Sequence, residues 1–199
     1  MYLENPKKYS MLVEQAHQVA LNVLRPISRK YDKAEHEYPK ELDMLASLLD
    51  GMNEGSPNGA GATSATGGSS NSNTSEIKNG ANLSTVMGII EMCWGDVGLL
   101  LAMPRQGLGN AAIAAVANEE QLERFKGTWA AMAITEPNCG SDSAAIRTTA
   151  TKDGDDYILN GEKIYVTSGA RADSVVVWAT LDKNIGRAAI KSFVVKHGT

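Results

Sequence analysis

Apolar side chains recur at helical spacing near the amino terminus. Between about residues 8 and 24 they occupy one face, at Leu12, Ala16, Val19, Ala20, Val23 and Leu24. This stripe predicts an amphipathic helix. Pro26 is expected to kink or end it, because proline lacks the backbone N–H that an α-helical turn needs. A second, shorter helix is predicted after Pro39, with Gly51 as its stop signal.

The pattern disappears between residues 51 and 82, where Gly, Ser, Asn, Thr and Ala dominate and large apolar side chains are almost absent. Such a tract buries too little apolar surface to offset its ordering entropy, so it is expected to be a flexible loop. Helical spacing resumes at Leu83 and extends to Phe125.

Short strands are predicted beyond Gly127, separated by turn residues. They cover residues 129–135, 157–159, 163–167, 174–180 and 192–195. Asn160-Gly161 lies between two of them and predicts a type I′ hairpin turn. The order of elements indicates an α+β protein. The expected parts are 1–50 (helices), 51–82 (loop), 83–126 (rest of the helical domain) and 127–199 (an incomplete β-domain).

Composition narrows the choice of partner. Of the 199 residues, 43% are hydrophobic, which is enough to form a buried core. The net charge of −4 indicates no basic surface for nucleic acid. We expect no membrane span, because no apolar stretch approaches about 20 residues, and a cytoplasmic location, because no signal peptide is evident. Cys93 and Cys139 stand alone, so neither a metal site nor a disulfide is expected.

The stretch from Thr135 to Asp142 is the first candidate site. A strand brings the hydroxyl of Thr135 to a turn containing Pro137, and Gly140-Ser141 follows with backbone N–H groups that could hold a phosphate oxygen. An ordinary β-turn with a solvated serine explains the same residues. The stretch alone is therefore weak evidence for a ligand site.

The second candidate is the segment from Leu159 to Gly169. Strand alternation would put Lys163, Tyr165 and Thr167 on one face, where a planar heterocycle could stack on the tyrosine and hydrogen-bond to the threonine. An amphipathic strand with a surface tyrosine is the simpler reading of this segment by itself.

Together the two segments resemble the acyl-CoA dehydrogenase family. The resemblance rests on Thr135-Glu136-Pro137, Gly140-Ser141-Asp142, Asp153-Gly154, Leu159 to Lys163, and Thr167. It implies an all-α domain followed by a small antiparallel β-barrel-like domain, cut before a carboxy-terminal helical bundle. That bundle would carry the glutamate base and the segment that holds the ADP half of the flavin, so no catalytic residue is assigned to this chain.

The resemblance implies an FAD site, with residues from both segments. They are Met132, Ala133, Ile134, Thr135, Gly140, Ser141, Tyr165, Val166 and Thr167. Thr135 would hydrogen-bond to the pyrimidine edge of the flavin ring and Thr167 would lie near N5. Ser141 would contact both the FAD pyrophosphate and the pantetheine arm of an acyl-CoA substrate. Glu136 would belong to the turn and not act as the base.

The activity implied by the resemblance is oxidation of an acyl-CoA to the trans-2-enoyl-CoA, with electrons passed to an electron-transfer flavoprotein. A homo- or hetero-oligomer is the expected form of the full-length protein. Two alternatives stay open. An acyl-CoA oxidase or flavin monooxygenase of the same fold would use O₂, and a non-catalytic flavin or acyl-CoA binding subunit would act only with a partner.

Overall fold

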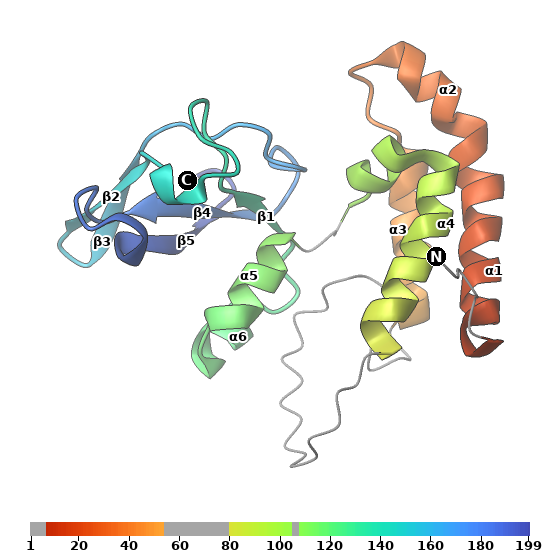
Figure 1. Ribbon diagram of the computed structural model, residues 1–199, viewed down its shortest axis with the longest axis horizontal. Helices are drawn as coiled ribbons and strands as arrows, with labels where there is room; N and C mark the ends of the chain where they lie inside the picture. Colours follow the sequence, from red (N-terminus) through yellow and green to blue (C-terminus); the bar gives the residue numbers. More distant parts are fainter. Residues whose placement is uncertain (1–6, 54–79, 105–107) are drawn as a thin grey trace. The chain divides into compact units, whose positions relative to one another are not determined.

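The computed structural model describes residues 7–53, 80–104 and 108–199. Among these residues the chain forms two compact units, a helical unit of residues 7–53 and 80–104 and a sheet unit of residues 108–199 (Figure 1). Most of the loop expected at 51–82 lies outside the described residues. At its edges, 51–53 and 80–82 belong to helices.

The first helix of the helical unit continues through Pro26. A 3₁₀ turn (η1, Lys7–Tyr9) leads into α1 (Ser10–Val19), a π-helical turn (η2, Ala20–Leu24) and α2 (Arg25–Ala34). The Arg25 N–H donates to the Ala20 carbonyl, five residues back. This turn shifts the hydrogen-bond register directly before the proline, where the missing N–H would otherwise leave an α-helical turn incomplete. Pro26 therefore does not end the helix.

Two more helices complete this unit, α3 (Glu41–Asn53), which runs past Gly51, and α4 (Gly80–Ala102). Asp96 interrupts α4 with non-helical backbone angles (φ −172°, ψ 120°), and its carboxylate accepts from the Leu99 N–H at 2.8 Å and from the Ser28 hydroxyl. The buried centre of the unit is formed by apolar side chains from η2, α3, α4 and the residue that follows α4: Leu24, Leu42, Leu45, Leu99 and Met103.

Helix α4 is more apolar than the sequence analysis recognised. Residues 83–102 have a mean hydropathy of 1.5, enough to cross a membrane by length and composition alone. The expectation that no apolar stretch approaches this length is therefore wrong, because the polar residues within α4 are too few to lower its mean hydropathy. Core helices of globular proteins pass the same test, so the finding by itself does not indicate a span.

The sheet unit begins with α5 (Leu108–Val116) and α6 (Glu119–Arg124). Five strands follow: β1 (Ala130–Ala133), β2 (Thr149–Asp153), β3 (Asp156–Asn160), β4 (Ser174–Thr180) and β5 (Ile190–Lys196). Strand β4 pairs with β5 along one edge and with β1 and the end of β2 along the other, while β3 pairs with β2 (Figure 1).

The predicted α+β class and family fold are confirmed, with differences in detail. The sheet is mixed, since β1 runs parallel to β4. Helices α5 and α6 lie in the sheet unit, not with the other helices as expected for 83–126, because Ile113 packs with Ala130 and Val176 and the side chains of Leu122 and Phe125 adjoin them. The small apolar residues of α5 suit close packing on a sheet.

The hairpin was predicted at the wrong turn. Strands β2 and β3 are joined through Gly154, and Asp153 pairs with Asp156 across a two-residue loop. Gly154 has φ 60° at the first central position, as a type II′ turn requires. Residues 163–167 form no strand, and Asn160-Gly161 leads out of the hairpin. Strand β2 was not predicted, because its exposed residues show no apolar alternation.

Candidate functional site

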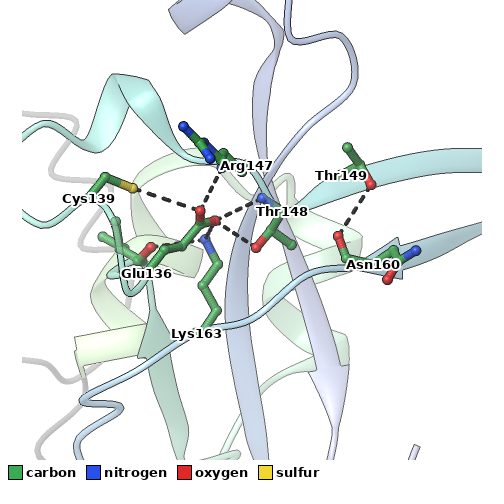
Figure 2. A network of polar contacts seen from close by, with 8 residues as sticks. Glu136, Cys139, Arg147, Thr148, Thr149, Asn160 and Lys163 are labelled. Carbon is green, nitrogen blue, oxygen red and sulfur yellow. Dashed lines mark hydrogen bonds and ion pairs between the residues drawn. The ribbon is translucent and has the colours of Figure 1, made fainter.

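A buried ion pair joins the two candidate segments. Glu136 follows β1 and is 6% exposed, and Lys163 follows β3 with its side chain 9% exposed. The lysine Nζ lies 2.8 Å from the Glu136 Oε1 and also donates to the Ile134 carbonyl at 2.9 Å. Figure 2 shows the lysine reaching the carboxylate from the neighbouring chain segment. One side chain thus ties the segment after β3 to the end of β1.

Four further donors surround the Glu136 carboxylate. The Thr148 hydroxyl and N–H donate to Oε1 at 2.6 and 2.9 Å, the Arg147 N–H donates to Oε2 at 2.6 Å, and the Cys139 thiol lies 3.8 Å from Oε2 (Figure 2). Burial alone would raise the pKa of Glu136. The hydrogen bonds from Lys163, Thr148 and Arg147 outweigh burial and lower the pKa from 4.5 to about 2.

This environment excludes Glu136 as a general base. Its carboxylate is buried, ionised and fully engaged, whereas a base must reach a substrate proton and accept it near the working pH. The structure thus agrees with the expectation that Glu136 belongs to the turn. Its role is to hold Thr135 and the segment after Lys163 in place.

Gly161 is needed for this arrangement. A Cβ at this position would collide with the side chain and Cα of Thr148, which is buried and bonded to Glu136. The glycine therefore allows the segment after β3 to pass directly over Thr148. Close approach, and not a hairpin turn, explains this Asn-Gly pair.

The predicted ring-contacting residues lie along the end of β1. Met132 is half-buried and Ala133 is buried in the strand, and Ile134 and Thr135 follow it, half-buried. The Ile164 N–H donates to the Thr135 carbonyl at 2.9 Å, directly beside Tyr165. The structure therefore brings the first segment alongside the second, as a shared ligand surface would require.

Tyr165 differs from its expected conformation. It lies in an irregular stretch with φ 55°, a region that aromatic residues rarely adopt, and it is 88% exposed. The predicted alternation of Lys163, Tyr165 and Thr167 on one strand face is wrong, since Lys163 is buried while Tyr165 and Thr167 are exposed. Backbone strain of this kind is frequent at functional sites, which makes Tyr165 a candidate ligand contact.

The remaining predicted residues fit a flavin nucleotide. Gly140 and Ser141 are exposed just before the 3₁₀ turn η3 (Ser143–Ala145), and Val166 is half-buried. Within the described ranges the hydroxyls of Thr135, Ser141 and Thr167 have no hydrogen-bond partner, so all three are available to a ligand. Neutral hydroxyls and an aromatic ring are suited to a flavin ring with its phosphates.

Sequence reasoning missed Arg147 and Thr148. Both contact Glu136 through backbone N–H groups, which no side-chain pattern reveals, and Thr148 also contacts it through its hydroxyl. Within the described parts of the chain, no group of three His, Cys, Asp or Glu residues could hold a metal ion, and both cysteines are free.

Comparison with known proteins agrees with the geometry. The acyl-CoA dehydrogenase middle domain matches residues 131–199. A 3-(aryl)acrylate reductase from Clostridium sporogenes is 30% identical over 95% of this chain and 48% of its own length. A cyclohex-1-ene-1-carbonyl-CoA dehydrogenase from Geobacter metallireducens is 44% identical over 41% of this chain and 22% of its own length.

A solved structure shares the fold along the whole chain. Butyryl-CoA dehydrogenase from Megasphaera elsdenii has a TM-score of 0.74 and 27% identity, and the match covers 100% of this chain and 51% of that protein. The chain thus spans about half the length of this protein and of the reductase. The matched domain, the sequence relatives and the shared fold support membership of the acyl-CoA dehydrogenase family.

Proposed function

We propose that this chain supplies the flavin-binding part of an FAD-dependent enzyme that dehydrogenates an acyl-CoA between Cα and Cβ. The observation that carries the proposal is that Ile164 bonds to Thr135, with Tyr165 and Thr167 exposed on the segment that follows. The hydroxyls of Thr135 and Thr167 are unpaired in the described structure, and Tyr165 is exposed in a strained conformation beside Thr135. The acyl-CoA dehydrogenases among its relatives support the proposed activity.

Bound FAD would supply the hydride acceptor, which no amino-acid side chain can provide. Tyr165 would cover the ring by stacking. Thr135 and Thr167 would orient it through hydrogen bonds, and Ser141 would hold a phosphate oxygen and the pantetheine arm. The Glu136–Lys163 pair would act indirectly, by fixing the separation of Thr135 and Thr167 without touching the ligand.

Flavin binding by this chain tests the proposal. FAD is titrated into the purified protein and its fluorescence quenching gives the dissociation constant. Tyr165→Ala should weaken binding roughly 2- to 10-fold, the value of a lost aromatic contact. Thr167→Ala should weaken it by about 0.5–1.5 kcal/mol. Thr151→Ala, an exposed threonine of β2, is the matched control and should change nothing.

Two results would contradict the assignment. One is FAD binding that is unchanged by both site variants. The other is equal weakening by Thr151→Ala, which would indicate a general effect of losing a threonine. The acyl-CoA proposal is tested separately, in a longer protein that also carries the carboxy-terminal helical bundle implied by the family resemblance. Anaerobic addition of butyryl-CoA should bleach the absorbance of the flavin bound to that protein.

The reverse reaction is a second candidate. The 3-(aryl)acrylate reductase matches 95% of this chain, and its name describes reduction of an α,β-double bond. Reduced flavin on the same surface would then deliver the hydride. Cinnamate and crotonyl-CoA, each mixed anaerobically with the dithionite-reduced protein, distinguish the two, since a reductase of this kind reoxidises the flavin with the free acid.

The electron acceptor is part of the proposal. We infer an electron-transfer flavoprotein as the acceptor, whereas an oxidase would use O₂ instead. Oxygen consumption during acyl-CoA turnover separates them, because a dehydrogenase should consume little O₂ and reduce the flavoprotein. If the protein binds flavin and acyl-CoA but shows no turnover with either acceptor, a binding subunit would be favoured.

A further inference from the structure

A cavity of about 220 Å³ lies in the sheet unit, apart from the residues assigned to the flavin. Its walls are η3 with the two residues that follow it, the end of β4, and the loop that leads into η4 (Gly186–Ala189). The residues with polar side chains among those that line it are Arg147, Thr180 and Lys183.

Two cations without acidic partners face this cavity. Neither Arg147 nor Lys183 forms an ion pair or a side-chain hydrogen bond with any residue that the structure describes. Only the backbone N–H of Arg147 bonds to Glu136, and Figure 2 shows its guanidinium group extending away from that carboxylate. The nearby Asp182 carboxylate accepts from the Asn184 N–H at 2.8 Å and leaves Lys183 unneutralised.

Thr180 adds an independent observation. It is 3% exposed, and its Oγ1 is buried without a hydrogen-bond partner among the described residues. A buried, unsatisfied hydroxyl costs free energy unless a ligand or water completes it. Ser174 Oγ and Trp178 Nε1 on the same strand are also unsatisfied, but neither residue lines the cavity.

We propose that this cavity binds a phosphate group. Arg147 offers a planar fork of N–H donors matched to phosphate oxygens, Lys183 adds a second positive charge, and Thr180 donates its otherwise unpaired hydroxyl. Two cations with a buried donor favour a doubly charged phosphate over a neutral ligand. The phosphate is either free or the terminal monoester of a nucleotide. The inference does not rest on the proposed flavin function.

Nuclear magnetic resonance of the ¹⁵N-labelled chain tests the site without flavin or turnover. Inorganic phosphate is titrated at constant ionic strength, and amide shifts of Thr180, Lys183 and Gly186 are followed. We expect saturable shifts at these residues. Arg147→Gln and Lys183→Gln should each weaken binding roughly 10- to 100-fold, the value of a charged hydrogen bond. Lys152→Gln, an exposed cation of β2, is the control and should have no effect.

The role of the Thr180 hydroxyl is tested with two matched variants. Thr180→Val keeps the shape of the side chain and removes the hydroxyl, and it should weaken phosphate binding several-fold. Ser174→Ala removes an equally buried, unpaired hydroxyl from the same strand away from the cavity, and it should leave binding unchanged. Equal weakening by both variants would contradict a role for the Thr180 hydroxyl in the site.

Coenzyme A and dephospho-coenzyme A distinguish the two sources. If only the first shifts the cavity amides, the site takes a nucleotide phosphate monoester. If the two ligands behave alike while inorganic phosphate binds, the site takes free phosphate. The proposal is overturned if none of the three ligands gives saturable shifts at Thr180, Lys183 and Gly186, or if those shifts persist unchanged in both Arg147→Gln and Lys183→Gln.

Discussion

Two glutamates, one in each unit, have their pKa lowered to about 2 by a lysine and a hydroxyl, yet their surroundings differ. Glu136 in the sheet unit is 6% exposed and its lysine side chain is 9% exposed. Glu41 in the helical unit bonds to Lys30 at 2.8 Å and Tyr31 at 2.5 Å, with the glutamate and lysine side chains 38% and 57% exposed.

A lowered pKa therefore does not by itself measure how much an ion pair contributes to the stability of the fold. Water screens the Lys30–Glu41 pair, and either partner can be solvated when the other is lost. Removing Lys163 would instead leave the Glu136 charge buried and unpaired, a large cost. The buried pair also joins two segments that are distant in sequence, whereas the exposed pair joins neighbouring helices.

The largest expected effect is that of Lys163→Met. It should lower the free energy of unfolding of the sheet unit by about 3–5 kcal/mol. The measurement is urea unfolding in a Trp94→Phe background, which leaves Trp129 and Trp178 as reporters of that unit. Lys30→Met is the matched control and should change stability far less; it is followed through Trp94 in a Trp129→Phe/Trp178→Phe background. Equal losses in both units would contradict the comparison.

Acid should weaken the sheet unit through Glu136. The pKa of this carboxyl is lower in the folded state (about 2) than its usual value of 4.5, so its contribution is complete above pH 4.5 and is lost as pH falls toward 2. The full difference corresponds to about 3 kcal/mol. Urea unfolding from neutral pH down to about pH 3 should show this loss in the wild type and less of it in Glu136→Gln. Identical pH profiles would refute the assignment.

Thr148→Val should have a smaller effect. It removes the 2.6 Å hydroxyl bond to the buried carboxylate and keeps the side-chain shape, at a cost of about 1.5–3 kcal/mol. Tyr31→Phe removes the corresponding hydroxyl from Glu41 and should cost less, because water replaces that donor. Unfolding measurements on both variants test the difference. A greater loss from Tyr31→Phe would reverse the ranking of the two sites.

The smallest expected effect is that of salt on the pKa values of the two glutamates. Raising the ionic strength from about 0.1 to about 1 M shortens the screening length from about 10 to about 3 Å. The pKa of Glu41 should then rise toward its usual value, while that of Glu136 should stay nearly constant because water and ions do not reach it. Carboxyl ¹³C titration curves at the two salt concentrations measure both. Equal shifts would show that Glu136 is screened like a surface group.

Features that depend on local apolar spacing could be predicted from the sequence, and features that depend on contacts between distant residues could not. Periodic burial made α1, β4 and the α+β order predictable, because apolar spacing records which face is covered. The π turn before Pro26, the packing of α5 on the sheet and the irregular path around Tyr165 depend on contacts between distant residues. The side chain of Lys163 is buried in its ion pair with Glu136, and the pattern of an exposed strand face could not indicate this contact. The motif residues could be identified, but their geometry needed the fold.

The most direct measurement of the central claim is a titration of the ¹⁵N-labelled chain with FAD. The claim is that the Glu136–Lys163 pair holds the two segments together as one flavin surface. The amides of Thr135 and Thr167 should then shift with the same dissociation constant, while Thr151 does not respond. Different constants for Thr135 and Thr167, or saturable shifts elsewhere with neither of them responding, would contradict the account.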